Sequence, residues 1–163
     1  MQPSLPIPEL LQQLSAFATT IAGNLSGNEI DWTWRPDPAS WSLGEVMCHL
    51  RDVEKEVHAV RYKAVVAEEN PFLPGAATDE WATIRCYEEQ DGPTARDAFL
   101  AARQQNLSHL QSLDEESWQR LGRHAFLGPT SLQELVNLAV QHDEVHQQQI
   151  QELLRKQADS LQD

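Results

Sequence analysis

The sequence has few cysteines and no long apolar run, and these two shortages exclude several classes of protein. Its two cysteines, Cys48 and Cys86, form neither a metal-binding pair nor a disulfide framework, which favours a reducing compartment. No stretch approaches the roughly 20 apolar residues that a membrane-spanning helix needs. Basic residues are missing before Arg35, so the start lacks the charged region of a secretory signal peptide. We therefore expect a cytoplasmic protein without a membrane partner.

Basic residues are also scarce overall. Lysine and arginine number 12 against 25 acidic residues, and the net charge is −13. No run of Lys and Arg interrupts this excess, so we expect no attraction to nucleic-acid phosphate or to an anionic membrane surface. A length of 163 residues suits one domain. We expect a single domain over 1–163, with its core at about residues 8–155.

Apolar residues at helical spacing dominate the chain, and no stretch shows convincing strand-type alternation. A short helix is expected at 81–90, and one or two further turns at 114–121. The pattern predicts an all-α four-helix bundle with an extra short helix or ordered loop between helices two and three. It leaves open which way the connection at 71–93 crosses the bundle. The four long helices are expected at about 8–25, 42–70, 94–113 and 131–156.

The second long helix has a clear start and a regular apolar face. Ser42 and Glu45 have the spacing of a capping box, in which each side chain satisfies a free backbone N–H. The fourth helix has a similar start, with Thr130 or Ser131 as the cap. Apolar residues of the second helix recur at an unbroken 4-3-4-3-4 spacing and predict one buried stripe: Val46, Leu50, Val53, Val57, Val60 and Ala64.

Two histidines interrupt the apolar stripe of the fourth helix. His142 and His146 are four residues apart, so both imidazoles lie on one helix face. That face is expected to point into the bundle, where an unpaired imidazole is costly to bury. A divalent metal ion would satisfy both rings. The stripe comprises Leu135, Ala139, His142, His146, Ile150 and Leu153.

A third ligand from another helix would complete a metal site. His49, at the rim of the second helix's stripe, is the best candidate. His58, nine positions further on, is expected on the opposite face of that helix and is therefore a poor co-ligand. His109 and His124 remain open alternatives.

Three neutral imidazoles suit Zn²⁺, Ni²⁺, Fe²⁺ or Cu²⁺ better than Mg²⁺ or Ca²⁺. Three protein ligands also leave a coordination position open for water or substrate, as in catalytic sites. Glu45, Asp52 and Gln149 are candidates to orient the ligand rings through hydrogen bonds. The simpler interpretations are that Glu45 only caps the helix, that Asp52 is only a solvated charge and that Gln149 is an ordinary surface residue. For Glu45 and Gln149 we favour these simpler interpretations.

Two segments together resemble the DinB/YfiT-like superfamily of metal-dependent enzymes. WSLGEVMCHLRDVE (Trp41–Glu54) matches a motif of Trp-Ser, Glu, His-Leu and an acidic pair, and HDEVHQQQI (His142–Ile150) matches His-x-x-x-His followed by Gln-Ile. The resemblance covers about residues 8–155. It implies a four-helix bundle with a metal, usually zinc or nickel, held by His49, His142 and His146. Many members look like homodimers, and characterised relatives include thiol-dependent S-transferases and a mycothiol-dependent isomerase.

The resemblance implies a divalent-metal-dependent enzyme, either a thiol S-transferase or a hydrolase. Its metal would activate a low-molecular-weight thiol or water toward a small electrophilic substrate, and the chain would form a homodimer. No motif identifies a thiol-cofactor pocket. The alternative function is a non-catalytic bundle that binds a metal or a small ligand, and a third is a metal-free bundle whose histidines sense pH.

Overall fold

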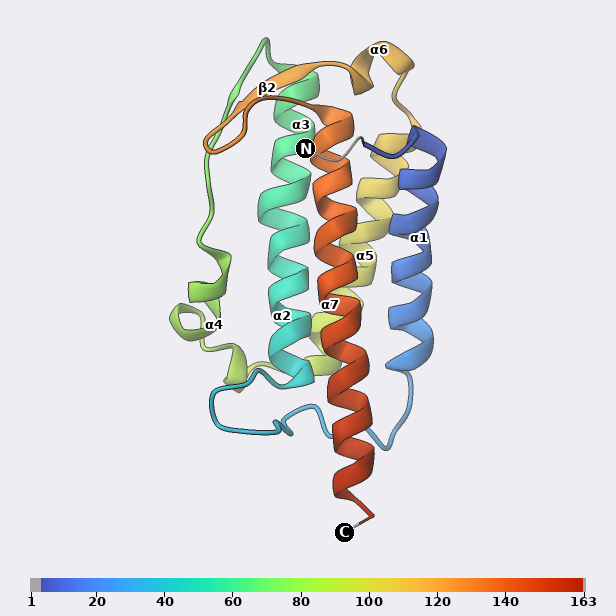
Figure 1. Cartoon of the computed structure of the whole chain (residues 1–163), viewed down its shortest axis with the longest axis vertical. Coiled ribbons are helices and arrows are strands. Elements are labelled where there is room, and N and C mark those ends of the chain that lie inside the picture. Colours follow the sequence, from blue (N-terminus) through green and yellow to red (C-terminus); the bar gives the residue numbers. More distant parts are fainter. Residues whose placement is uncertain (1–3, 163) are drawn as a thin grey trace.

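Four long helical rods form a bundle in the computed structural model, which describes residues 4–162 (Figure 1). This confirms the predicted fold class. One rod is composite, because α2, η1 and α3 follow one another without a break. α1 and α7 run in one direction, and the composite rod and α5 run in the other. The rods are α1 (Ile7–Asn24), α2 (Leu43–Val53) with η1 (Glu54–His58) and α3 (Ala59–Ala67), α5 (Gly92–Gln111) and α7 (Leu132–Ser160).

Side-chain caps set where three of the rods begin. Ser42 starts α2 with the expected capping box, and Ser131, not Thr130, starts α7 with another. α5 begins two residues before the predicted position because the carboxylate of Asp91 accepts the backbone N–H of Thr94 at 2.9 Å. α7 extends past its predicted end near residue 156, since the last turns to Ser160 stay helical.

The packing order decides the direction of the connection that the sequence left open. α5 packs against both α1 and α2, and α7 packs against the same two helices on the other side. α2 and α5 are therefore adjacent and run the same way (Figure 1). Their connection must return along the whole length of the bundle before α5 can begin.

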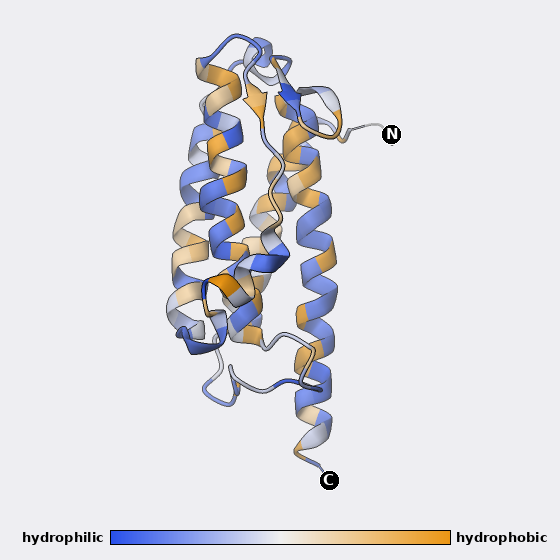
Figure 2. Ribbon diagram, turned by 90° about the vertical axis from the view of Figure 1, so that its left-hand side faces the viewer, coloured by the Kyte–Doolittle hydropathy of each residue, from blue (hydrophilic) through white to orange (hydrophobic). Residues whose placement is uncertain are grey.

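That connection runs over the outer face between the composite rod and α7 (Figure 2). The phenol of Tyr87 donates to the carboxylate of Asp52 at 2.7 Å, and Arg85 donates to Asp52 and to Glu56, at 2.8 Å each. These contacts fix the connection to the composite rod. It contains η2 (Thr78–Glu80), α4 (Trp81–Ile84) and η3 (Tyr87–Glu89), which confirms a short helix in 81–90.

A small sheet covers the end of the bundle where α3 ends and α7 begins (Figure 1). The prediction that the chain has no strands is wrong here, because strands of two to four residues are too short to show alternation. The helical turns expected at 114–121 are present as α6 (Glu115–Trp118). β1 (Phe72–Leu73) pairs parallel with β2 (Leu121–His124), which pairs antiparallel with β3 (Gly128–Ser131).

The composite rod contains a π-helix, η1, and this changes which residues face the core. A π-turn takes up one residue more than an α-turn, so the buried stripe shifts along the chain after η1. Val60, predicted to be buried, is 56% exposed, and Ala64 is half-buried, whereas Tyr62 is 1% exposed and Val65 is fully buried. His58, expected on the opposite face, lies in the core. None of the described helices has the length and apolarity needed to cross a membrane.

Candidate metal centre

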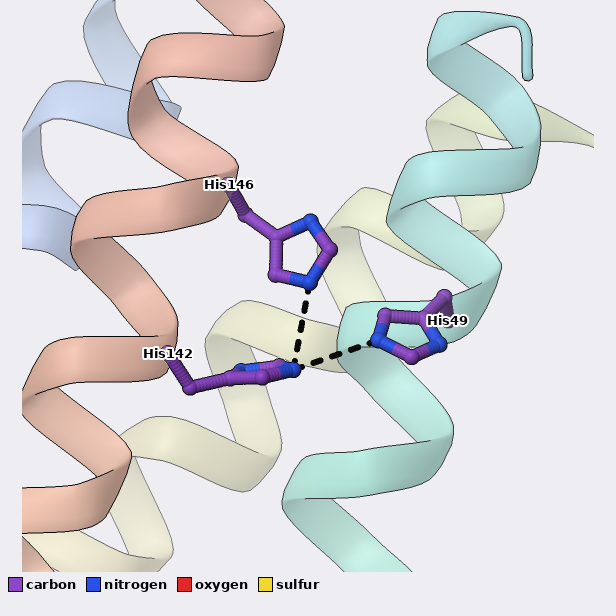
Figure 3. A group of neighbouring side chains, drawn as sticks. All are labelled: His49, His142 and His146. Atoms are coloured by element: carbon purple, nitrogen blue, oxygen red, sulfur yellow. Dashed lines mark hydrogen bonds between the residues drawn. The ribbon is translucent and has the colours of Figure 1, made fainter. Parts of the chain in front are cut away.

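Three imidazole rings converge between α2 and α7 (Figure 3). Nε2 of His142 lies 3.2 Å from Nε2 of His49 and 3.1 Å from Nε2 of His146. One ligand atom from each of the three rings lies within 4.8 Å of those of the other two. The structure thus brings together the three histidines that the sequence analysis selected, from segments more than 90 residues apart.

The spacing of these nitrogens fits a metal ion. Ligand nitrogens at about 2.1 Å from a tetrahedral zinc ion are about 3.4 Å from one another, close to the two distances measured from Nε2 of His142. Nε2 of His142 also faces two ring nitrogens at once, and a neutral ring has at most one hydrogen there to offer. A cation would satisfy the lone pairs that face each other.

Burial keeps the three rings neutral, which is the form that binds a metal. Burial is the largest cause of the pKa shift of each ring, and it contributes most to lowering the pKa of His49 to about 4 and that of His142 to about 2. The neighbouring His146 lowers both further. Burial also lowers the pKa of His146 itself, against the opposing effect of Gln149.

Gln149 has the contact expected of a residue that orients a ligand ring. Its Oε1 lies 2.7 Å from Nδ1 of His146, so Nε2 of that ring faces the other two histidines. Gln149 is half-buried and contacts this ring, so the contact favours an orienting role over that of an ordinary surface residue. On the other side of the group, the ring of Trp41 packs against His49 with 5.1 Å between the ring centroids.

The side chains of Glu45 and Asp52 make their hydrogen bonds to groups other than the three rings, among the residues that the structure describes. Glu45 closes the capping box by accepting the backbone N–H of Ser42 at 2.7 Å, as its simpler interpretation predicted. It also pairs with Arg35 at 3.0 Å. Asp52 accepts hydrogen bonds from arginine and tyrosine side chains and anchors the connection described above.

Two further histidines that the sequence left open lie outside this group. His109 is on α5, and His124 is on β2 at the sheet end of the bundle, where its Nδ1 accepts the backbone N–H of Phe126 at 3.3 Å. Neither belongs to the set of ligand atoms that lie within reach of one ion.

A cleft of about 600 Å³ opens beside His146. Trp41, Val145 and Leu153 form its apolar walls, and the carboxylate of Asp79 lines it from η2. Asp79 raises the pKa of both His49 and His146, which places its negative charge near the group. Sequence analysis missed Asp79 because its segment has no helical spacing, and only the path of the connection brings it to the histidines.

One buried arginine joins all four rods next to the histidines. Arg103 is 1% exposed and donates twice to the carboxylate of Glu54, at 2.8 and 2.9 Å. It also donates twice to Asp143, at 2.7 and 2.9 Å, and once to the carbonyl of Leu14 at 3.1 Å. All five N–H groups of the guanidinium are satisfied. The carboxylate of Asp143, the residue next to His142, is thus directed to Arg103 and not to the histidine group.

Comparison with known proteins agrees with this arrangement. A structure of YfiT from Bacillus subtilis, described as "a probable metal-dependent hydrolase with an unusual four-helix bundle topology", superposes with a TM-score of 0.82. The match covers 97% of this chain and 93% of that one at 17% sequence identity, and identity this low shows a shared fold alone. No curated protein matches the chain. The model of the DinB superfamily matches residues 8–150, and the chain therefore belongs to that superfamily.

Proposed function

We propose that this protein is a divalent-metal-dependent enzyme that activates water or a small thiol toward a small electrophilic substrate. His49, His142 and His146 would hold the ion, with zinc or nickel as the metals best suited to three imidazoles. The observation that carries the proposal is the convergence of three neutral imidazoles, in which Nε2 of His142 lies 3.1 to 3.2 Å from Nε2 of each of the other two rings. A bound metal would supply Lewis acidity, which lowers the pKa of a coordinated water or thiol.

The cleft beside His146 supports a small-molecule substrate. Its volume of about 600 Å³ lies within the range of small-molecule sites, roughly 300 to 1,000 Å³. Trp41 and Leu153 offer apolar surface to the body of a substrate, and Gln149 keeps His146 turned toward the reacting centre. His146 lines the cleft, so a substrate bound there would lie next to the nucleophile.

Asp79 is the residue of this cleft best placed to move a proton. Its carboxylate lines the cleft, where it can accept the proton that the attacking water or thiol gives up. Glu152 also lines the cleft, but it is engaged by Arg155 at 2.8 Å and by Lys156 at 3.4 Å. We therefore assign the role of general base to Asp79.

The first experiment tests the metal. Protein purified from medium with zinc and nickel is analysed for metal content, and we expect about one ion per chain in the wild type. His146→Ala should lose most of it, and His124→Ala, which removes a histidine outside the group, should keep it. Equally little metal in the wild type and in His146→Ala would rule out the three-histidine site.

The second experiment tests catalysis with a panel of cellular thiols, electrophiles and esters. Asp79→Asn should lower kcat by about 100-fold or more without loss of metal, and the adjacent Glu80→Gln serves as the matched control. If the wild type holds metal, loses thermal stability on chelation and turns over nothing in the panel, the non-catalytic binding module is favoured instead.

A further inference from the structure

His58 is a buried imidazole without a partner for its outer nitrogen. The residue is 9% exposed, and among residues 4–162 no group hydrogen-bonds to its Nε2. Burial lowers the pKa of His58 to about 4, so the ring is neutral near pH 7. Burying a polar group without a hydrogen-bond partner costs folding free energy. A role for Nε2 of His58 would explain why the protein keeps it there.

The π-helix is what places His58 in the core. If the same sequence formed an unbroken α-helix, nine steps from His49 would place His58 on the opposite face of the rod; the wider turn of η1 brings it toward the core. Its ring stacks on Tyr62, with 6.1 Å between centroids and 10° between planes. The ring of His142 meets that of His58 edge-on, with 5.7 Å between centroids and 78° between planes. Single π-turns occur frequently at functional sites.

Two rings of the group, His142 and His49, still need a partner for the nitrogen that faces away from the other histidines. A histidine that binds a metal through one nitrogen almost always donates the N–H of the other. His146 has Gln149 in that role. The backbone of Thr78 raises the pKa of His49, but Nδ1 of His49 has no hydrogen-bond partner in the described chain. Both hydrogen-bond contacts of His142 involve Nε2, which leaves its Nδ1 for a partner on the far side of the ring.

We propose that His58 is the positioning residue of His142, accepting the Nδ1–H of that ring at its own Nε2. Two imidazoles joined edge to edge by a hydrogen bond of about 3 Å have centroids about 5 Å apart, and 5.7 Å is close to that separation. The bond would fix the tautomer of His142 that presents the Nε2 lone pair to the other two histidines. This inference rests on the proposed metal site.

The test compares zinc affinity in two variants of His58 with that of the wild type, by competition with a coloured chelator. His58→Phe keeps the ring shape and removes the acceptor, and we expect its zinc Kd to rise about 10- to 100-fold. His58→Gln keeps an acceptor and should stay near the wild-type value. His109→Phe is the matched control, because Nε2 of His109 is also buried without a partner in the described chain but lies outside the metal group.

Four outcomes would overturn the proposal, and they distinguish a failure of the positioning role from a failure of the proposed function. An unchanged Kd in His58→Phe, with normal zinc binding by the wild type, overturns the positioning role alone. Equal losses in His58→Phe and His58→Gln also overturn it, because they would reflect packing. Four imidazoles around zinc by X-ray absorption would make His58 a ligand instead. A wild type that binds no zinc overturns both this inference and the proposed function.

A direct observation covers the case in which His58→Phe does not fold. In the zinc-loaded wild type, ¹⁵N NMR should show the Nδ1–H of His142 coupled across the hydrogen bond to Nε2 of His58. If Nδ1 of His142 exchanges freely with solvent and shows no such coupling, the proposed bond does not form.

Discussion

Single residues matter most where charge is buried, and Arg103 is the clearest case. Arg103→Leu would leave two carboxylates, Glu54 and Asp143, buried without their partner, and breaking a buried pair in this way costs about 3 to 5 kcal/mol. We expect urea unfolding to show a loss of that size. The matched control is Arg155→Leu, since Arg155 also contacts two carboxylates but its side chain is 58% exposed. That variant should lose less than about 1 kcal/mol, and equal losses would contradict the prediction.

At the scale of the element, the composite rod shows where sequence periodicity stops being informative. An unbroken spacing correctly predicts the buried face of α2, but it continues to Val60, which is exposed, and to Ala64, which is only half-buried. The periodicity assumes 3.6 residues in every turn, whereas η1 holds one residue more. The pattern contains no mark of this insertion, because Lys55 and Glu56 are ordinary exposed residues.

The π-helix leads to a prediction about deletions. Deleting the exposed Lys55 from η1 should restore an α-helix and leave His58, Tyr62 and Val65 facing the core, so the melting temperature should change little. Deleting the exposed Lys63 from the regular helix α3 should instead rotate Val65 out of the core and cost about 2 kcal/mol or more. Thermal melts of both deletions test this, and equal damage would show that η1 is not a simple insertion.

For the whole molecule, the buried histidines predict a stability that depends on pH. Burial lowers the pKa of His49 and His58 to about 4 from an ordinary value of 6.5. Between these values the unfolded chain binds more protons than the folded protein, so the free energy of unfolding falls as the pH falls through this window. Each residue should contribute a loss of roughly 3 kcal/mol.

Urea unfolding of chelator-treated protein between pH 7.5 and pH 4.5 measures this loss. His58→Gln removes one of the titrating groups, so the free energy of unfolding should depend less steeply on pH in this variant. If the free energy of unfolding of the wild type stays constant between pH 6.5 and pH 4.5, the assignment of neutral, buried rings is contradicted.

Much of this protein could be predicted from residues that are close together in the chain. Helical spacing and capping residues act over a few positions, so the four rods and the Ser42 and Ser131 boundaries could be recognised. The two histidines four apart on α7 belong to the same class of local signal. His49 could be selected from its place beside the stripe of the second helix, and the family resemblance points to the same residue.

The remaining features depend on contacts between distant segments, and these leave no local pattern. Tertiary packing alone determines that His58 lies in the core and that Asp79 lines the cleft. It also determines that Arg103 lies between Glu54 and Asp143. The sequence by itself determined which stretches are helical and which histidines share a helix face, because backbone hydrogen bonds and caps join near neighbours. The register after η1 and the partners of the buried charges were decided only when the rods packed, because their energies come from groups 40 or more residues apart.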